Sequence, residues 1–409
     1  MEIKKLYPVC KDYIWGGDKL KKKYGKNPKC DPCAESWELS FHPDGPTMLE
    51  DGTLLSDVVT EKEIGTNAKD LPFFPVLVKF IDAKNSPSVP MRPYDKYANN
   101  FDKIKVWYIV EAEKGAGIYL GVNRHVSLEE YKSATRRNAL TKLLRFFPVK
   151  AGESYFIPSG TPHAIGAGCL ICEIQQNSNP THRGYGYERE HNVCPPRELD
   201  IENAMQVTNR APYTPRTFLG KTLGISKYFN AQKLNVRTSL SLNATEKSFQ
   251  CITCTRGSGK INGQNFKRGD SFFIPAGYGN YTLEGYMTTI LTDIRRYCLG
   301  INIGRNIIRS AIIDDEGNIV FRGKVTTDRK KGEDMVLYNI LILCRHMAKR
   351  VGIQISDFSG IGIDVPDPDC LNLDYPCLAD KLSDAFGIQS KIARSKTGDP
   401  PFKAVKLFK

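Results

Sequence analysis

Residues 152–165 read GESYFIPSGTPHAI, and residues 269–282 repeat the same frame as GDSFFIPAGYGNYT. In both segments a glycine is followed after five residues by a proline, and after one more residue by a second glycine. Short strand-forming runs bounded by glycine and proline turns are typical of β-barrels and jelly rolls. The repeat therefore predicts two related barrels in one chain.

The two copies of the repeat differ at one position that matters for chemistry. His163 in the first copy aligns with Asn280 in the second. Imidazole is the commonest metal ligand among side chains, so a metal site would belong to the first barrel. A single histidine at a strand edge can equally have a structural role, and both interpretations stay open from the residues alone.

The composition is that of a soluble globular protein. The chain has 409 residues, of which 41% are hydrophobic and 25% charged, which leaves room for two or three domains. No apolar run approaches the roughly 20 residues of a membrane span. The first residues lack the apolar core of a secretory signal. We therefore expect a cytoplasmic protein with no membrane partner.

The formal net charge of +13 does not by itself indicate nucleic acid. The basic residues form short scattered clusters, such as residues 19–26 and 135–145, without interleaved aromatic residues. Solvated surfaces, or attraction of an anionic small molecule, explain the charge better. The charge thus leaves a phosphorylated small molecule open as a partner, and nucleic acid is not expected.

Three cysteine pairs have the spacing found in zinc ribbons: Cys30/Cys33, Cys169/Cys172 and Cys251/Cys254. The second and third pairs lie in strand-like runs, where residues three apart point to opposite faces. The first pair lies in a turn-like segment that has no matching pair. We therefore expect these cysteines to be small apolar side chains.

The repeat frame resembles the second half of the cupin motif, and the wider chain resembles type I mannose-6-phosphate isomerases. The matching segments occur in the family's order and cover nearly all of residues 1–296: YIWGGDKL (13–20), ESWELSFHPDG (35–45), PVLVKFIDAK (75–84), VWYIVEAEKGAGIYLGVNR (106–124), GESYFIPSGTPHAIGAGCLICEIQQNSN (152–179) and RGDSFFIPAGYGNYTLEG (268–285). The resemblance implies a mainly β fold of double cupin (jelly-roll) barrels with helical insertions. The first barrel would extend to about residue 200 and the second over about residues 215–296.

The resemblance also implies a reaction, the interconversion of mannose 6-phosphate and fructose 6-phosphate with one zinc ion. This aldose–ketose isomerisation moves a proton between C1 and C2 through a cis-enediol, and negative charge develops on oxygen. A divalent cation can stabilise that charge, a base must reach the C–H proton, and cationic groups must hold the phosphate.

The family's zinc ligands are mostly replaced in this sequence. Pro90 and Arg92 occupy the positions of the Gln and His of the family's VQVHP-type strand end, and Lys105 occupies that of the Glu in KTE-WY. Only His163 matches. Proline has no side-chain donor, arginine stays protonated, and nearby cations repel a dication. We expect weak or absent zinc and impaired isomerisation, the alternative being a non-catalytic sugar-phosphate-binding or regulatory pseudoenzyme.

Other family positions are kept. Arg183 and Glu173 match residues that resemble catalytic groups of the family, and a set rebuilt from His163, His182 and Glu173 is conceivable although the spacing does not require it. Four further residues fit the substrate-binding positions of the family: Lys103, Lys79, Trp15 and Glu35. For Glu173 and Lys79 a buried ion pair or a snorkelling stem is the alternative interpretation.

Residues 297–409 begin a different pattern. Two apolar runs within residues 298–327 flank DDEG and predict a hairpin, residues 335–352 predict a helix, and residues 359–369 predict another strand. This order resembles the first lobe of an actin-like sugar kinase of the ROK (repressor, open reading frame, kinase) family. The implied fold is an α/β half-domain after the barrels.

The kinase signatures are altered in this segment. Asn302 and Arg305 replace the Asp and a Gly of the family's DIGGTxI turn, and Asp367 replaces a Gly of VPGP. Residues 391–401 show no clear counterpart of the NDAN segment, and the sequence ends before a second lobe. We therefore expect no phosphoryl transfer here. A lobe without its mate would expose a face that could self-associate or pack on the barrels.

Overall fold

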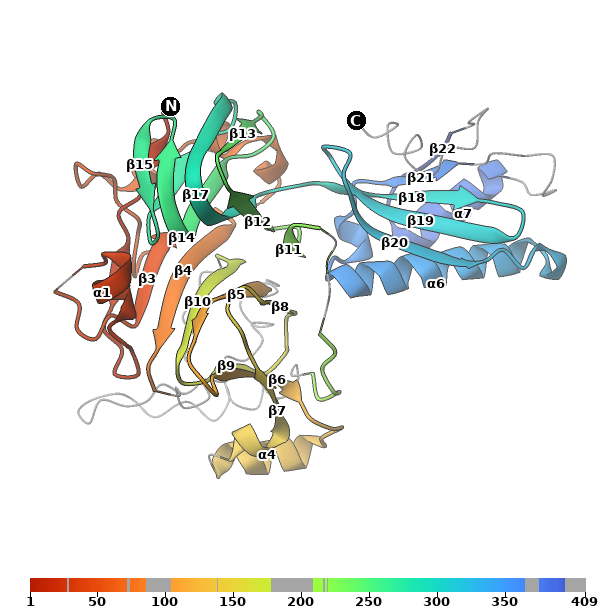
Figure 1. Cartoon of the computed structure of the whole chain (residues 1–409). Helices are drawn as coiled ribbons and strands as arrows, with labels where there is room; N and C mark the ends of the chain where they lie inside the picture. The colour runs from red at the N-terminus through yellow and green to blue at the C-terminus, as the bar shows by residue number, and fades with distance from the viewer. Residues whose placement is uncertain are drawn as a thin grey trace. The chain divides into compact units, whose positions relative to one another are not determined.

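The computed structural model describes residues 1–27, 29–71, 74–85, 104–137, 139–177, 209–215, 218, 220–364 and 375–393 (Figure 1). The chain divides into two compact units. The first comprises Met1–Pro215 and Ala231–Asp293, and the second comprises Arg216–Asn230 and Ile294–Lys409. We call them the barrel unit and the C-terminal unit.

The first barrel consists of two antiparallel sheets. Six strands form the larger sheet, in the order β2 (Val9–Lys11), β3 (Glu35–Leu39), β4 (Val76–Ala83), β10 (Cys169–Gln176), β5 (Lys105–Ala112) and β8 (Ser154–Ile157). Three strands form the smaller sheet, in the order β7 (Leu144–Pro148), β6 (Gly117–Val122) and β9 (His163–Ile165). Buried side chains from both sheets, among them Trp107, Ile118 and Ile165, form one hydrophobic cluster between them. Strands β4 and β10 are buried along their whole length, so both faces of the larger sheet are covered at its centre.

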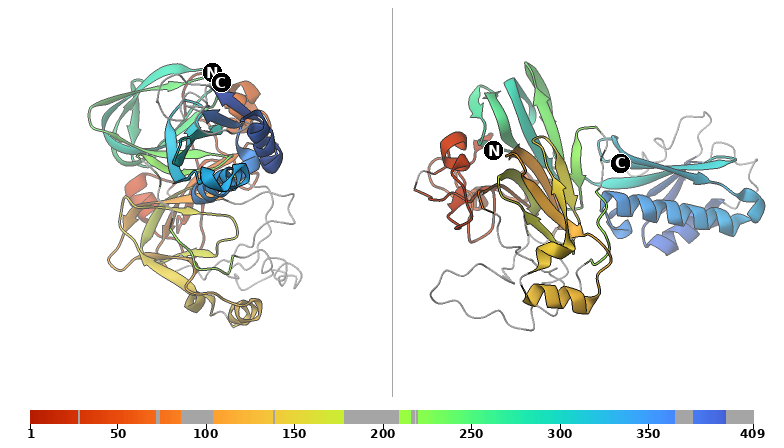
Figure 2. Two further views of the ribbon diagram at one scale, coloured as in Figure 1. Left: turned by 90° about the vertical axis from the view of Figure 1, so that its right-hand side faces the viewer. Right: turned by 60° about the horizontal axis from the view of Figure 1, so that its bottom comes forward.

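Short helices connect strands of the barrel unit: α1 (Lys19–Tyr24), α2 (Leu55–Val58), α3 (Glu61–Ile64), η1 (Thr66–Ala68), α4 (Leu128–Arg136) and η2 (Leu140–Leu143). Helix α4 begins at an N-cap, Ser127, whose hydroxyl accepts a hydrogen bond from the amide of Glu130. It lies at the end of the first barrel remote from the second barrel (Figures 1 and 2). The helical insertions thus leave the barrel interior to the strands.

The second barrel is built around two long strands. Its strands follow the order β1 (Lys4–Lys5), β16 (Ser271–Ile274), β14 (Gln250–Ile261), β17 (Gly279–Asp293) and β12 (Asn230–Val236), with β15 (Gln264–Lys267) beside β14 and β13 (Ser239–Ala244) beside β17. Fully buried aromatic and aliphatic side chains such as Phe266, Phe272 and Leu283 form its core.

The predicted repeat is present as a repeat of backbone geometry. In both turns the amide of the third residue after the proline, Pro158 or Pro275, donates to the proline carbonyl over 3.2 Å. The following glycines have nearly the same left-handed conformation, with φ of 72° at Gly160 and 75° at Gly277. Glycine adopts this conformation without the steric cost that a Cβ adds. The shared glycine–proline frame therefore reflects one turn used twice.

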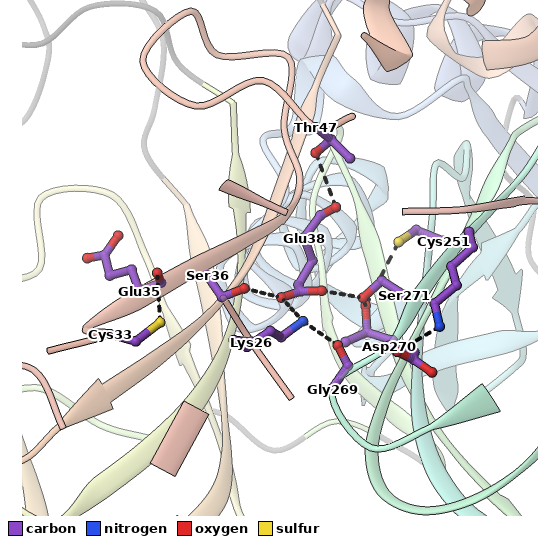
Figure 3. A network of polar contacts seen from close by, with 12 residues as sticks. Lys26, Cys33, Glu35, Ser36, Glu38, Thr47, Cys251, Gly269, Asp270 and Ser271 are labelled. Carbon is purple, nitrogen blue, oxygen red and sulfur yellow. Dashed lines mark hydrogen bonds and ion pairs between the residues drawn. The ribbon is translucent and has the colours of Figure 1, made fainter. Parts of the chain in front are cut away.

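A buried polar network ties the two barrels together (Figure 3). The carboxylate of Glu38 on β3 is fully buried, and its Oε1 lies 2.7 Å from Nζ of Lys26. Ser36 donates to Oε1 over 2.6 Å, and Ser271 of the second barrel donates to Oε2 over 3.0 Å. Lys26 also donates to the carbonyl of Gly269 in the second barrel. Both oxygens of one buried carboxylate thus link residues that lie far apart in the sequence.

Glu38→Gln is expected to lower the free energy of unfolding of the barrel unit by about 3 kcal/mol, because it leaves the Lys26 ammonium buried without a counter-charge. All three tryptophans lie in the barrel unit, so urea unfolding followed by tryptophan fluorescence reports on this unit alone. Lys22→Gln on α1 is the matched control, because it removes an exposed ion pair with Asp18 and should change little. A Glu38→Gln variant as stable as this control would contradict the prediction.

The C-terminal unit is a mixed sheet covered by helices. The sheet has the order β20 (Ile319–Thr326), β19 (Ile307–Asp314), β18 (Tyr297–Ile303), β21 (Ile361–Asp364) and β22 (Ser390–Ala393). The first three strands are antiparallel neighbours, whereas β21 and β22 continue parallel to β18. The remaining elements are α6 (Glu333–Val351), α7 (Tyr375–Phe386), β11 (Thr222–Ile225), η3 (Arg329–Lys331) and η4 (Ile355–Asp357).

The hairpin and the helix predicted for this unit are confirmed. The strand predicted over residues 359–369 is present as β21, and residues 365–369 lie outside the described residues. A hairpin joins β19 to β20 at residues 315–318, and α6 begins two residues before the predicted helix. Helix α6 ends at Gly352, which has a left-handed φ of 82°. Buried residues of α6 and α7 share one hydrophobic cluster with the sheet. In the described part of the chain, we find no helix with the length and apolar character that a membrane span requires.

Candidate active site

Four side chains form a line across the larger sheet of the first barrel. Trp37 on β3, Lys79 on β4, Glu173 on β10 and Trp107 on β5 stand opposite one another in register. Residues directly opposite in antiparallel strands share a face and interact across the strands. Since Trp107 belongs to the hydrophobic cluster between the two sheets, this face is the barrel interior.

Charged groups alternate along this face. Nζ of Lys79 lies 3.2 Å from Oε1 of Glu173 and 3.2 Å from Oε2 of Glu35. Nζ of Lys105 lies 3.3 Å from Oε2 of Glu173 and 3.4 Å from the side-chain oxygen of Gln175. We call Glu35, Lys79, Glu173 and Lys105 the charged row. All four are buried, with at most 5% of each residue exposed, and their formal charges cancel.

Glu173 is held in its ionised form by its neighbours. Burial alone would raise the pKa of this carboxyl, but the ammonium groups of Lys105 and Lys79 outweigh it, together with the indole N–H of Trp107, which donates to Oε2 over 2.5 Å. The result is a pKa well below the ordinary glutamate range. The Trp37 indole donates in the same way to Glu35, over 2.8 Å.

His163 faces this line from the opposite sheet. Its ring lies edge-on to Trp107, with 5.3 Å between ring centroids, and Nδ1 lies 2.7 Å from the carbonyl oxygen of Thr161. A bond to a carbonyl requires the proton on Nδ1, so the neutral ring carries its lone pair on Nε2. At the equivalent position of the second barrel, Asn280 instead accepts a hydrogen bond from Asn243 over 2.6 Å. Only the first barrel offers an imidazole here.

Both barrels contain segments that match known protein families. Residues 3–116 match the catalytic domain of type I phosphomannose isomerases, and residues 220–294 match the cupin domain of mannose-6-phosphate isomerases. The mannose-6-phosphate isomerase ManA of Bacillus subtilis (strain 168) is 33% identical over 312 residues, which cover 70% of this chain and 97% of the relative. The chain belongs to the mannose-6-phosphate isomerase family. The mannose-6-phosphate isomerase of Streptococcus mutans is 30% identical over 298 residues, covering 68% of this chain and 93% of the relative.

The crystal structure of the mannose 6-phosphate isomerase from Bacillus subtilis gives the same assignment for the fold. It superimposes with a TM-score of 0.62 at 29% identity and covers 71% of this chain and 99% of that structure. The predicted mainly β, cupin-type fold is therefore confirmed. The assignment of the C-terminal unit to the ROK family stays a prediction.

The structure brings together only some of the residues proposed from the isomerase resemblance. Glu173, Lys79 and Glu35 meet in the charged row, and the first two form the buried ion pair that was the alternative to a direct role. Trp15 packs at the margin of the barrel cluster and stacks on Tyr13, with 5.6 Å between ring centroids. The other residues of that proposal lie outside the described residues: Pro90, Arg92, Lys103, His182 and Arg183.

Sequence reasoning missed the two tryptophans. Trp37 follows Glu35 by two residues, and Trp107 follows Lys105 by two residues. Residues two apart in a strand share a face, so this spacing already placed an indole beside each candidate. Their N–H groups satisfy two buried carboxylates.

Lys105 does not fit the zinc-ligand role that the resemblance implies for its position. A lysine ammonium has three protons and no lone pair. The sequence predicted that the charge of Lys105 would repel a dication. In the structure Glu173 compensates this charge. The obstacle at this position is the missing donor atom. Among the described residues, no group of three or more His, Cys, Asp or Glu is arranged to hold a metal ion.

Proposed function

We propose that this chain is a mannose-6-phosphate isomerase-type protein in which metal-dependent interconversion of mannose 6-phosphate and fructose 6-phosphate is impaired. One observation carries the proposal, the buried ion pair between Lys105 and Glu173 at the position of a family metal ligand. The replacements at Pro90 and Arg92 support it from the sequence. Zinc would have to bind without three of its four family ligands, which predicts weak binding.

The charged row by itself is a poor catalyst for moving a proton between C1 and C2. A base works best when its pKa lies near the operating pH, whereas the pKa of Glu173 is lowered. Both Glu173 oxygens also lie within 3.3 Å of an ammonium nitrogen. Removing a proton from carbon would therefore depend on a group other than Glu173. Arg183, the remaining sequence candidate for a catalytic role, stays protonated and could polarise the substrate but could not be that base.

A second candidate function, a non-catalytic sugar-phosphate binder, is favoured by the neutrality of the charged row. Ammonium and carboxylate groups that are already fixed can exchange hydrogen bonds with sugar hydroxyls without a metal. The phosphate would need cations beyond the row, since Lys79 and Lys105 are both ion-paired. Lys103 is the sequence candidate for that contact.

Purified protein is expected to hold well under one zinc per chain and to isomerise fructose 6-phosphate roughly 10³-fold more slowly than the Bacillus subtilis relative, because a metal Lewis acid contributes several kcal/mol. Elemental analysis measures the zinc content, and a coupled assay measures the isomerisation rate, on both proteins in parallel. Calorimetric titration with fructose 6-phosphate separates the two candidates, since a binder gives saturable heat without turnover. One zinc per chain together with turnover equal to the relative's would overturn the proposal.

For residues 297–409 we propose a ROK-like first lobe without kinase activity, separate from the barrel region at residues 1–296. The sheet order supports it, with three antiparallel strands followed by two parallel ones. The side-chain amide of Asn302, at the kinase aspartate position, donates to Asp364 on the neighbouring strand over 2.9 Å. Self-association stays part of this proposal. Tyr338 and Ile342, one turn apart on α6 and 57% and 45% exposed, are the side chains to test.

A further inference from the structure

Three cysteines meet at the edge of the larger sheet, outside the charged row. Cys10 lies on β2 opposite Ser36 of β3, and the amide of Ala34 donates to the carbonyl of Lys11 over 2.8 Å. This pairing places the chain that leads from Cys33 into β3 next to β2. The Cys33 thiol interacts with the side chains of both Cys10 and Cys30. We call these three residues the thiol cluster.

The members of the thiol cluster differ in access and in ionisation. Cys33 is fully buried, whereas Cys10 and Cys30 are partly exposed. The hydrogen bond from the Cys33 thiol lowers the pKa of Cys10 against the effect of burial, with further help from the Asn27 amide, the Ser36 hydroxyl and the Lys26 ammonium. The same contact with Cys10, followed by burial, raises the pKa of Cys33. The cluster thus pairs a partly exposed thiol of lowered pKa with a buried thiol of raised pKa.

Most other described cysteines lack this arrangement. Six of them are buried in the barrel and C-terminal cores, and burial raises the pKa of each: Cys169, Cys172, Cys251, Cys254, Cys298 and Cys344. Reactivity toward oxidants follows thiolate character and access, so these six should stay inert. Among the described residues no group of three or more His, Cys, Asp or Glu is arranged to hold a metal ion, and this includes the thiol cluster. Thiol oxidation is therefore the chemistry that fits it best.

We propose that Cys10 and Cys33 form a redox modification site that closes to a disulfide when a hydroperoxide oxidises Cys10. In the first step the Cys10 sulfur attacks one peroxide oxygen, the O–O bond breaks, and the other oxygen leaves as water after taking a proton. Cys10 is then a sulfenic acid. In the second step the Cys33 sulfur attacks the Cys10 sulfur, the S–O bond breaks, and the hydroxyl leaves as water with the Cys33 proton. Overall, two thiols and one hydrogen peroxide give one disulfide and two waters.

The cross-link would act on the entrance to β3. Sγ of Cys33 lies 4.0 Å from the carbonyl oxygen of Glu35, the first member of the charged row, as Figure 3 shows beside the Lys26–Glu38 network. A bond from Cys33 to Cys10 would fix this segment to β2. The modification site would thus connect the redox state of the protein to the strand that carries Glu35 and Glu38, whether or not the isomerase proposal holds.

Peptide mapping of the full-length protein tests the proposal. Reduced protein is treated with a small excess of hydrogen peroxide at neutral pH, blocked with N-ethylmaleimide, and digested without reductant by trypsin and Asp-N. Cleavage before Asp31 separates Cys30 from Cys33. The expected main product is a Cys10–Cys33 linked peptide, about 2 Da lighter than the sum of its thiol forms, that dithiothreitol resolves.

Two variants sharpen the test. In Cys33→Ser the sulfenic acid on Cys10 should persist and be trapped by dimedone, whereas Cys377→Ser, which alters a partly exposed thiol elsewhere, should leave the linked peptide unchanged. Recovery of Cys10 as the maleimide adduct in the wild type would overturn the proposal. So would a main disulfide formed through Cys30, Cys194 or Cys370, or between two chains. The wild-type map decides by itself if Cys33→Ser does not fold.

Discussion

Glu173→Gln is expected to lower the free energy of unfolding of the barrel unit by about 3–5 kcal/mol, because it removes the carboxylate between two buried ammonium groups and leaves the charged row with one excess positive charge. Lys79 and Lys105 are 3% and 4% exposed, so neither can turn to water without opening the barrel. The measurement is urea unfolding at pH 7, followed by tryptophan fluorescence. The indole of Trp107 donates a hydrogen bond to Glu173, so the fluorescence of this tryptophan reports on the substituted site.

The pH dependence of this effect has a defined sign. The pKa of Glu173 is lower in the folded protein than in the unfolded chain. Its contribution to stability is therefore complete above the unfolded value of about 4.3 and is lost as the pH falls below it. The gap between wild type and Glu173→Gln should be widest at neutral pH and should narrow below about pH 4. A gap that is absent at pH 7, or equal at pH 7 and pH 3, would contradict this assignment.

A second substitution separates lost charge from lost packing. Adding Lys105→Met to Glu173→Gln removes the excess positive charge and returns the charged row to neutrality, so the double variant should be more stable than Glu173→Gln alone. Glu130→Gln provides the matched control, because its partner Arg124 and Glu130 itself are exposed and screened by solvent. If the double variant were the less stable, the Lys105–Glu173 pair could not be the source of the effect.

The sequence predicted the turns better than the strand order. The glycine–proline frame specifies local backbone conformation, which is why the turns at Gly160 and Gly277 could be predicted from a few letters. The charged row depends on long-range pairing instead. Strand β10 comes last of the three central strands in the chain, yet it lies between β4 and β5. Only this placement lets Glu173 contact Lys79 and Lys105 at once.

The difference between local motifs and long-range pairing also explains why the sequence singled out Lys105 but did not predict its ion pair with Glu173. Its position in K-I-K-V-W-Y predicts that it replaces a family glutamate, and that prediction needs no structure. Whether its charge adds to the pocket or is neutralised depends on which side chain of β10 faces it. Register decides this, and register follows from burial of whole strands rather than from any local motif.

Replacing Lys105 by glutamate is expected to make the stability of the barrel unit depend on a divalent cation. Lys105→Glu turns the neutral charged row into one with two excess negative charges, placed within the barrel interior beside Glu173. Buried like charges destabilise the folded state, so this variant alone should unfold more readily than the wild type. A divalent cation would restore neutrality, with a carboxylate now available as a donor. Added zinc should therefore raise the melting temperature of Lys105→Glu far more than that of the wild type.

The full reversion Pro90→Gln, Arg92→His and Lys105→Glu is expected to bring zinc to about one per chain and to raise fructose 6-phosphate turnover on the order of 10³-fold. Three donor atoms return together, and His163 supplies the fourth. The control carries Ala, Ala and Met at the same positions, which removes the native side chains without adding donors. Elemental analysis and the coupled assay compare the two. Equal zinc content in both variants would mean that these positions do not form the ligand shell, because the control matches every change except the presence of lone pairs.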